Sequence, residues 1–285
     1  MPASDFAAQM HHAIRDIDVR GRMHVAAWEL GTDDGKLVIR GEEVVTAAST
    51  IKVPILAAAL KEVGSGRLEL DRPMPVPTRR AGGSGVLQAL TGLVSLTLAD
   101  LLTLMVIVSD NAATNAIIEL LGMDHINAFC AEQGLGGTVL RRRMMDAAAI
   151  SQGLENTTTA LDQAKLLDAV AETALLAEPL RTFALQALAA QQFTDALPSL
   201  LPDSVQVAHK TGELPGVRHD VGIITAANGR RAVVSVLVTG LAGGPISPRA
   251  GAAGPGESPQ SLKVNAGNAI AAVGYAAWQA LDRSV

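Results

Sequence analysis

Ser49-Thr50-Ile51-Lys52 opens a stretch that is predicted to be helical from Thr50 to Val63. Residues three apart on a helix share a face, so the amine of Lys52 can lie beside the hydroxyl of Ser49. A serine hydroxyl is a weak nucleophile at neutral pH and needs a neighbouring base. Ser49 also lies at the positive end of the helix dipole, where backbone N–H groups can stabilise an oxyanion. The stretch therefore predicts a nucleophilic serine with Lys52 as its proton acceptor.

A second string, Ser109-Asp110-Asn111, follows about 60 residues later. It lies between an apolar helix predicted over residues 96–108 and another predicted over residues 112–121. A tight corner between two helices can project a hydroxyl and an amide into a cleft. We interpret Ser109 as a proton shuttle to the leaving nitrogen of a substrate, and Asn111 as a hydrogen-bonding partner of the substrate.

A third string, Lys210-Thr211-Gly212, ends a run of residues that alternates like a strand. A lysine and a hydroxyl at a strand edge suit a substrate carboxylate, and a glycine lets the substrate approach the backbone closely. The next backbone N–H, at Glu213, is predicted to be the second oxyanion donor. Lys210 is also the candidate cation that lowers the pKa of Lys52, as a base requires.

The three strings occur in the order found in active-site serine acyl-transferases. The sequence also resembles class A β-lactamases over most of residues 22 to 240. The likeness is carried by residues 49–54, 98–122 and 209–224. It implies a serine hydrolase that forms an acyl-enzyme and that uses no metal or other cofactor.

This resemblance implies a role for each matching residue. The implied catalytic residues are Ser49, Lys52, Ser109 and Glu213. The implied substrate-binding residues are Asn111, Lys210, Thr211 and Arg218. Arg218 would be a second cation for the substrate's carboxylate, although Glu213 stands where a small residue is more common.

The sequence departs from the family pattern in the omega loop. Class A enzymes carry L-x-R-x-E there, and the glutamate activates the water that removes the acyl group. Here Met144 aligns with that glutamate, and Asn156 aligns with the aspartate that usually closes the loop. We predict that Arg142 contacts Asn156 across the loop neck. Asp146 and Glu155 are the nearest carboxylates, and each is a hypothetical activator of the deacylating water.

Two classes of function stay open at this point. The first is an enzyme, for which β-lactam hydrolysis is the family default and esterase or transacylase activity on another acyl substrate is the alternative. The second is a penicillin-binding protein that acylates on Ser49 and deacylates slowly. Met144 favours the second class, because acylation needs only the Ser49 machinery whereas deacylation needs a positioned water.

Composition narrows the partners of this 285-residue chain, of which 48% is apolar, 18% charged and 2% aromatic, with a net charge of −5. Nucleic-acid binding needs basic stripes and stacking aromatics, so no nucleic-acid partner is expected. The six histidines show no metal-ligand spacing, and Cys130 is the sole cysteine, so no internal disulfide can form. The expected partner is a small molecule bearing a carboxylate. The sequence does not predict the oligomeric state.

The N-terminal residues 1–20 contain three aspartates and no apolar h-region, so no signal peptide is predicted. The apolar run at residues 96–108 is too short to span a bilayer, and no membrane partner is expected. We therefore expect a cytoplasmic protein as sequenced, or a periplasmic or secreted one if a leader was removed. A cytoplasmic location weakens an antibiotic-resistance role.

The remaining pattern predicts an α/β (α+β) fold. An antiparallel sheet is flanked by N- and C-terminal helices, and an all-helical subdomain is inserted between the early and late strands. We expect one β-lactamase-like unit over residues 1–285, with an α/β subdomain (1–48 plus 202–285) and a helical subdomain (49–201). The predicted strands are 23–30, 36–40, 205–212, 219–226 and 231–240, and the predicted flanking helices are 4–18 and 264–281. Residues 242–261 are predicted to be a mobile loop, and the site should lie in the cleft between the two parts.

Overall fold

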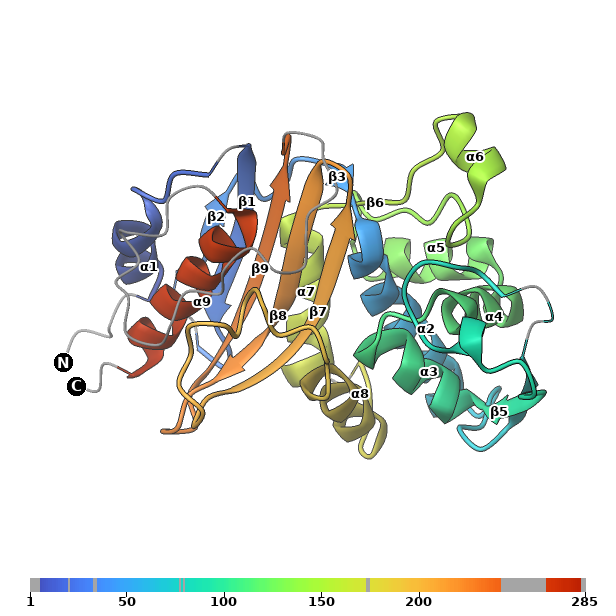
Figure 1. Ribbon diagram of the computed structural model, residues 1–285. Coiled ribbons are helices and arrows are strands. Elements are labelled where there is room, and N and C mark those ends of the chain that lie inside the picture. The colour runs from blue at the N-terminus through green and yellow to red at the C-terminus, as the bar shows by residue number, and fades with distance from the viewer. Residues whose placement is uncertain are drawn as a thin grey trace.

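A five-stranded antiparallel sheet in the order β2-β1-β9-β8-β7 forms the framework of one half of the molecule (Figure 1). Its strands are β1 (Arg22–Glu29), β2 (Leu37–Ile39), β7 (Gln206–Leu214), β8 (Val217–Thr225) and β9 (Arg231–Thr239). The computed structural model describes residues 6–19, 21–32, 35–76, 78, 80–172, 175–241 and 265–282. The early strand β1 pairs along its whole length with the late strand β9. This pairing confirms the predicted fold class.

Strand alternation divides the core into two layers. Val25 and Ala27 on β1 face the terminal helices, whereas Ala26 and Trp28 face the inserted helices. On the first face, α1 (Phe6–Ile14) and α9 (Ala266–Asp282) pack against each other and against the sheet (Figure 1). The predicted partnership of the first and last helices is therefore confirmed.

The second face of the sheet meets the inserted segment. Its longer helices are α2 (Lys52–Gly64), α3 (Leu98–Ile107), α4 (Asn111–Leu121), α5 (Met123–Glu132), α7 (Ala160–Glu172) and α8 (Leu180–Ala189). Its short elements are η1 (Ala48–Ile51), η2 (Leu87–Ala89), α6 (Ala147–Ser151) and the strand pairs β3 (Val45–Thr46) with β6 (Thr157–Thr158) and β4 (Pro73–Pro75) with β5 (Ser95–Thr97). Helix α7 packs directly on β1, β8 and β9. The division into two subdomains stays a prediction.

One local prediction is corrected by the structure, and another lies outside the described residues. The helix predicted from Thr50 begins as the 3-10 turn η1 and becomes α-helical only at Lys52. The loop predicted at residues 242–261 lies outside the described residues.

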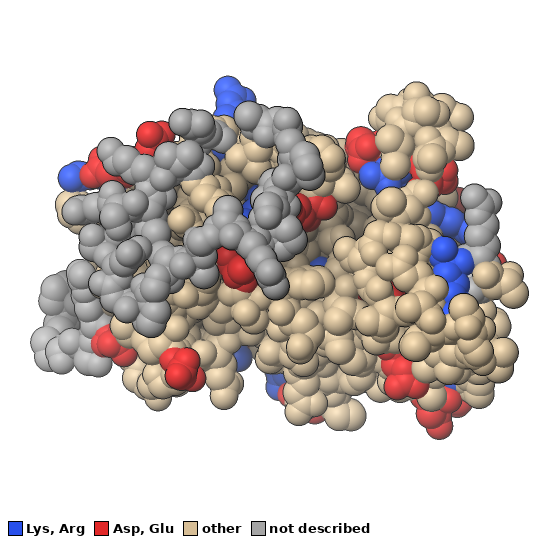
Figure 2. Space-filling view, in the orientation of Figure 1, with Lys and Arg blue, Asp and Glu red and all other residues tan. Residues whose placement is uncertain are grey.

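Within the described ranges, no helix is long and apolar enough to cross a membrane. On the face in Figure 2, the drawn acidic and basic side chains are interspersed rather than gathered into a basic stripe.

Candidate active site

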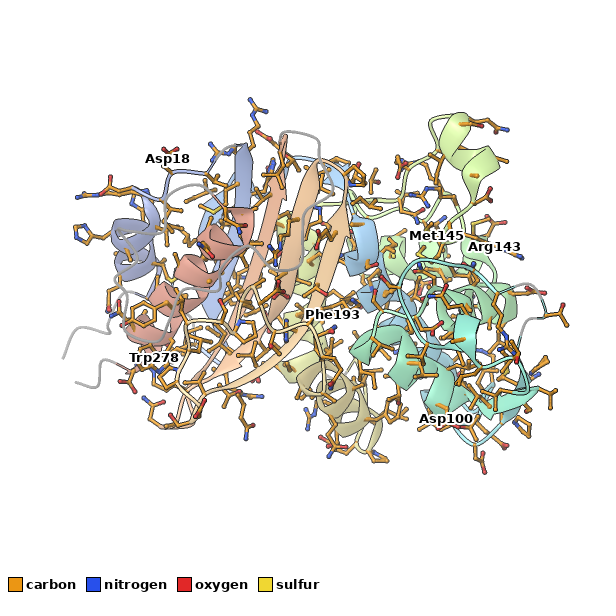
Figure 3. The ribbon with its side chains drawn as sticks, in the orientation of Figure 1. Asp18, Asp100, Arg143, Met145, Phe193 and Trp278 are labelled. Carbon is orange, nitrogen blue, oxygen red and sulfur yellow. The ribbon has the colours of Figure 1, made fainter. Side chains whose placement is uncertain are left out.

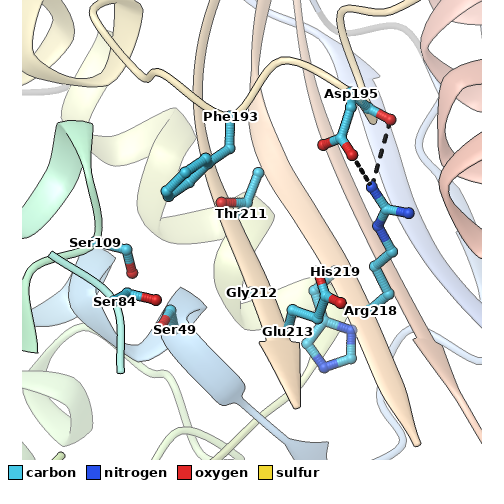
Figure 4. A pocket seen from close by; sticks show the side chains of 10 residues that line it. All are labelled: Ser49, Ser84, Ser109, Phe193, Asp195, Thr211, Gly212, Glu213, Arg218 and His219. Atoms are coloured by element: carbon cyan, nitrogen blue, oxygen red, sulfur yellow. Dashed lines mark hydrogen bonds and ion pairs between the residues drawn. The ribbon is translucent and has the colours of Figure 1, made fainter. Parts of the chain in front are cut away.

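The turn that carries Ser49 is held in a strained conformation. Ala48, directly before it, has a φ of 46°, in the left-handed region that a non-glycine residue rarely adopts. The turn is fixed by the hydroxyl of Thr50, which donates to the carbonyl of Ala47 at 2.6 Å, and by the N–H of Ala47, which donates to the carbonyl of Asn156. Ser49 thereby lines a pocket of about 270 Å³ between the inserted helices and β7 (Figure 4).

Lys52 lies one turn further and is completely buried. Its Nζ donates to the carbonyl oxygen of Ser109 at 2.7 Å, to Ser109 Oγ at 2.9 Å and to Asn111 Oδ1 at 2.9 Å. Burial, and then the nearby charge of Lys210, hold the pKa of Lys52 well below its ordinary value, while Asp110 acts in the opposite direction. A lysine whose pKa is lowered in this way gives up its proton more readily and can act as a base.

The corner between α3 and α4 projects its two outer residues toward Lys52. Ser109 has a φ of 53° and lines the pocket. Asp110 braces the corner, because its carboxylate accepts from the N–H groups of Val86, Leu87 and Ala113 at 2.7–2.9 Å. Asn111 accepts from Lys52 and donates from Nδ2 to the carbonyl of Gly82 at 2.9 Å.

Strand β7 forms the opposite wall of the pocket. Thr211 lines the pocket, whereas the side chain of Lys210 is completely buried and does not line it. Lys210 Nζ donates to the carbonyl of Thr211 at 2.8 Å. Burial lowers the pKa of Lys210 to about 7, against the opposing effect of Asp220. Of this pair, Thr211 is the member that reaches the pocket surface.

Gly212 lies against the amides of the nucleophile turn. A Cβ at this position would lie 3.2 Å from the N atom of Ser49 and 3.1 Å from that of Thr50. Any side chain would therefore crowd the place where the N–H groups of Ser49 and Glu213 can converge on an oxyanion.

We expect Gly212→Ala to lower the acylation rate of Ser49 by about 10²-fold, the typical loss when one oxyanion donor is disturbed. Some loss of stability is also expected, because the added Cβ crowds the backbone of Ser49 and Thr50 and the buried side chain of Thr50. Stopped-flow acylation and thermal unfolding measure the two effects. Gly136→Ala is the matched control, since a Cβ at Gly136 meets nothing within 4 Å. Equal acylation rates in the two variants would contradict this use of Gly212.

Arg218 lies at the far end of the pocket and forms an ion pair with Asp195. Its Nη2 donates to Asp195 Oδ2 at 2.7 Å and to the carbonyl of Asp195 at 3.4 Å (Figure 4). Glu213 is exposed at the same end. Partial desolvation raises the pKa of Glu213, which Arg218 counteracts and Asp195 reinforces.

Three residues that line this pocket were not predicted from the sequence: Ser84, Phe193 and Asp195. His219 braces the site, as its Nδ1 accepts from the N–H of Val238 and its Nε2 therefore donates to the carbonyl of Thr46 at 2.8 Å. Burial lowers the pKa of His219 to about 4, so the ring is neutral at pH 7. Ser84, Phe193 and Asp195 come from loops without a local motif, so no sequence signal marks them.

The omega-loop segment is closed by polar contacts at its neck. Asn156 Oδ1 accepts from the N–H groups of Arg141 and Arg142 at 2.8 and 3.0 Å, and its Nδ2 donates to the carbonyl of Arg142. The predicted contact between Arg142 and Asn156 is therefore present, through the backbone of Arg142. The guanidinium of Arg142 instead pairs with Glu155 Oε2 at 2.8 Å.

The two carboxylates proposed for deacylation lie outside the pocket of Ser49. Asp146 is the N-cap of α6, and its Oδ1 accepts from the N–H of Ala149 at 3.0 Å. Glu155 is held by Arg142. Met144 is buried, and its backbone is fixed by two hydrogen bonds to the side chain of Asn115. In Figure 3, Met145 and Arg143 mark the segment that leads to α6.

Comparisons with known proteins agree with this geometry. The model of the "Beta-lactamase enzyme family" matches residues 6–280. A search of curated protein sequences finds no match. Among solved structures, a β-lactamase from Sphaerobacter thermophilus is 30% identical, with 98% of each chain covered and a TM-score of 0.78.

Two further structures are similar over nearly the whole chain. PBP-A, solved as a point mutant in an acyl-enzyme complex with penicillin G, is 27% identical with a TM-score of 0.79, covering 100% of this chain and 98% of PBP-A. A β-lactamase from Chitinophaga pinensis is 20% identical with a TM-score of 0.81, covering 97% of this chain and 99% of the other, and shows the shared fold. This chain therefore belongs to the β-lactamase enzyme family and is a serine hydrolase of the class A β-lactamase and PBP-A type.

Proposed function

We propose that this protein opens β-lactams, or related amides and esters with a nearby carboxylate, through an acyl-enzyme on Ser49, and that removal of the acyl group is the slow step. The observation that supports this most is the buried amine of Lys52. It is held by three hydrogen bonds at the corner next to Ser49, and its pKa is lowered. The hydrogen bonds fix the position of the amine, and its lowered pKa suits a base that accepts the serine proton once the amine is deprotonated.

The proposed acylation uses groups that line one pocket, together with Lys52, which contacts Ser109. Ser49 Oγ attacks the carbonyl carbon as its proton passes to Lys52 Nζ, and the N–H groups of Ser49 and Glu213 hold the resulting oxyanion. The carbon–nitrogen bond then breaks, and the leaving nitrogen receives a proton from Ser109 Oγ, which Lys52 replenishes across 2.9 Å. Thr211 binds the substrate's carboxylate, and the amide of Asn111 binds the acyl side chain.

Slow deacylation is inferred from the omega loop. Hydrolysis of the acyl-enzyme needs a positioned water and a base for it. Met144 stands at the position of the family's glutamate, while Asp146 caps α6 and Glu155 pairs with Arg142. The related protein PBP-A forms an acyl-enzyme complex with penicillin G in its leucine-to-glutamate mutant, which supports the acylation step of the proposal. Asp146→Asn and Glu155→Gln test whether either carboxylate still contributes.

The experiment is incubation with a chromogenic cephalosporin while the intact mass is followed over time. We expect a burst of colour and an adduct that persists for many minutes, and neither in Ser49→Ala. Steady colour without an adduct would show that the protein hydrolyses the cephalosporin but that deacylation is not the slow step. No colour and no adduct, together with no release from p-nitrophenyl esters, would overturn the acyl chemistry itself.

A further inference from the structure

The loop over residues 191–197 carries two side chains to the pocket wall and is fixed at both ends. Gln191 is buried, and its Nε2 donates to the carbonyl of Val106 at 2.8 Å, while its Oε1 accepts from the N–H of Phe193 at 3.1 Å. At the other end, the N–H of Leu197 donates to Asp220 Oδ2 at 2.9 Å. Phe193 and Asp195 are therefore held against the pocket rather than lying there loosely.

Asp195 changes the role that Arg218 can have. The side chain of Arg218 is only 9% exposed and pairs with Asp195 Oδ2 at 2.7 Å. Its Nη1 also packs so closely against Gly267 that a Cβ there would lie 2.6 Å away. A substrate carboxylate would have to compete with Asp195 for this arginine. The carboxylate of Asp195 is 55% exposed, and its Oδ1 makes no hydrogen bond within the described part of the chain.

The charges around the pocket favour a cation at this end. Among the described residues that line it, the charged side chains are Asp195, Glu213 and Arg218, which leaves one excess negative charge. Lys52 and Lys210 are completely buried and do not line the pocket, and burial lowers the pKa of Lys210 to about 7. Opposite signs at close range attract, most strongly where water is partly excluded.

Phe193 provides a second feature that fits a cation. Its ring is 42% exposed and lines the same pocket, on the loop that also carries Asp195 (Figure 4). The face of an aromatic ring attracts organic cations, and an aromatic ring beside a carboxylate is a common site for ammonium and similar groups. Neither residue is needed for the acyl chemistry at Ser49.

The two residues lie on the leaving-group side of the site. In a β-lactam, the carboxylate is attached to the carbon next to the lactam nitrogen, so the group that meets Thr211 belongs to the leaving side. Phe193 lies beside Thr211 in Figure 4, with Asp195 further along the wall. We propose that Phe193 and Asp195 are specificity-determining residues that favour acyl donors with an ammonium or pyridinium group on the leaving-group side. This inference rests on the proposed acylation of Ser49.

Cephaloridine and cephalothin provide a matched pair of probes, because they share one acyl side chain and differ in a pyridinium against an acetoxy group at the 3′ position. The measurement is the second-order rate constant for acylation of Ser49 by each drug. Dividing the ratio of a variant by the wild-type ratio removes the difference in intrinsic reactivity. This quotient of ratios also does not depend on the fraction of active protein in each preparation.

We expect Asp195→Asn to lower the cephaloridine-to-cephalothin ratio about fivefold, as for loss of one partly exposed charge pair. Phe193→Leu should lower the ratio about threefold, because it keeps an apolar side chain but removes the ring. Asp203→Asn is the matched control, since Asp203 is exposed and lies outside this pocket. It should leave the ratio unchanged.

The possible failures can be told apart. If neither drug acylates the wild-type protein, the proposed function fails and not merely its specificity. If both drugs acylate but Asp195→Asn and Phe193→Leu keep the wild-type ratio, the inference about these two residues is overturned. Should Asp195→Asn fail to fold, the wild-type ratio is measured at low and high salt. Screening must then lower it, and a ratio independent of salt overturns the role of Asp195.

Discussion

Replacing Lys52 by alanine should slow the acylation of Ser49 by about 10³-fold, within the range that a positioned general base contributes. The amine is completely buried beside the nucleophile turn, and all three of its hydrogen bonds go to Ser109 and Asn111. No other described side chain occupies that place. Rapid-quench mass spectrometry of the penicillin adduct measures the rate. Lys61→Ala is the matched control, because Lys61 lies on the same helix but is exposed.

The pH dependence of acylation identifies the base more directly. A base works in its deprotonated form, so the acylation rate should rise with pH as Lys52 loses its proton. The midpoint should lie well below the ordinary lysine value, because burial and Lys210 lower the pKa of Lys52. Lys210→Gln removes one of these causes, so the midpoint should move to higher pH. A midpoint that stays or moves lower would show that another group titrates.

The parts of the site that the sequence predicted correctly are local. The spacing of Ser49 and Lys52 uses the helix period, and the corner at residues 109–111 is marked by the two helices that it joins. The pairing of early with late strands was predicted because both had to belong to one antiparallel sheet, and β1 does pair with β9. In each case, residues close together in the sequence determine the local element, and folding brings these elements together.

The parts that the sequence missed depend on distant contacts. Asp195 and Arg218 are 23 residues apart, and only the docking of the 191–197 loop against β8 brings them together. A free cation was therefore expected where the structure has an ion pair. Similarly, the contact between Arg142 and Asn156 was predicted, but not the pairing of the Arg142 guanidinium with Glu155, so that the backbone of Arg142 makes the contact. Such competition cannot be read from residue types alone.

Substituting Met144 with glutamate should speed removal of the acyl group by about 10²-fold, the lower end of what a positioned base contributes. The backbone at this position is already fixed, because its N–H donates to Asn115 Oδ1 at 2.8 Å and its carbonyl accepts from Asn115 Nδ2 at 3.1 Å. A glutamate side chain would start from that anchored point, as in the family's usual loop. Burying its charge should lower stability, because Met144 is only 8% exposed.

Met144→Gln is the matched control, since glutamine has nearly the same shape as glutamate but cannot accept the proton of a water molecule. The measurement is the decay of the preformed penicillin adduct after excess drug is removed, followed by intact mass. Faster decay in Met144→Glu alone would show that the missing carboxylate limits turnover. If both variants lost the adduct as slowly as the wild-type protein, the water would have to be excluded or activated elsewhere. If both accelerated equally, polarity at position 144 would be the cause and not a base.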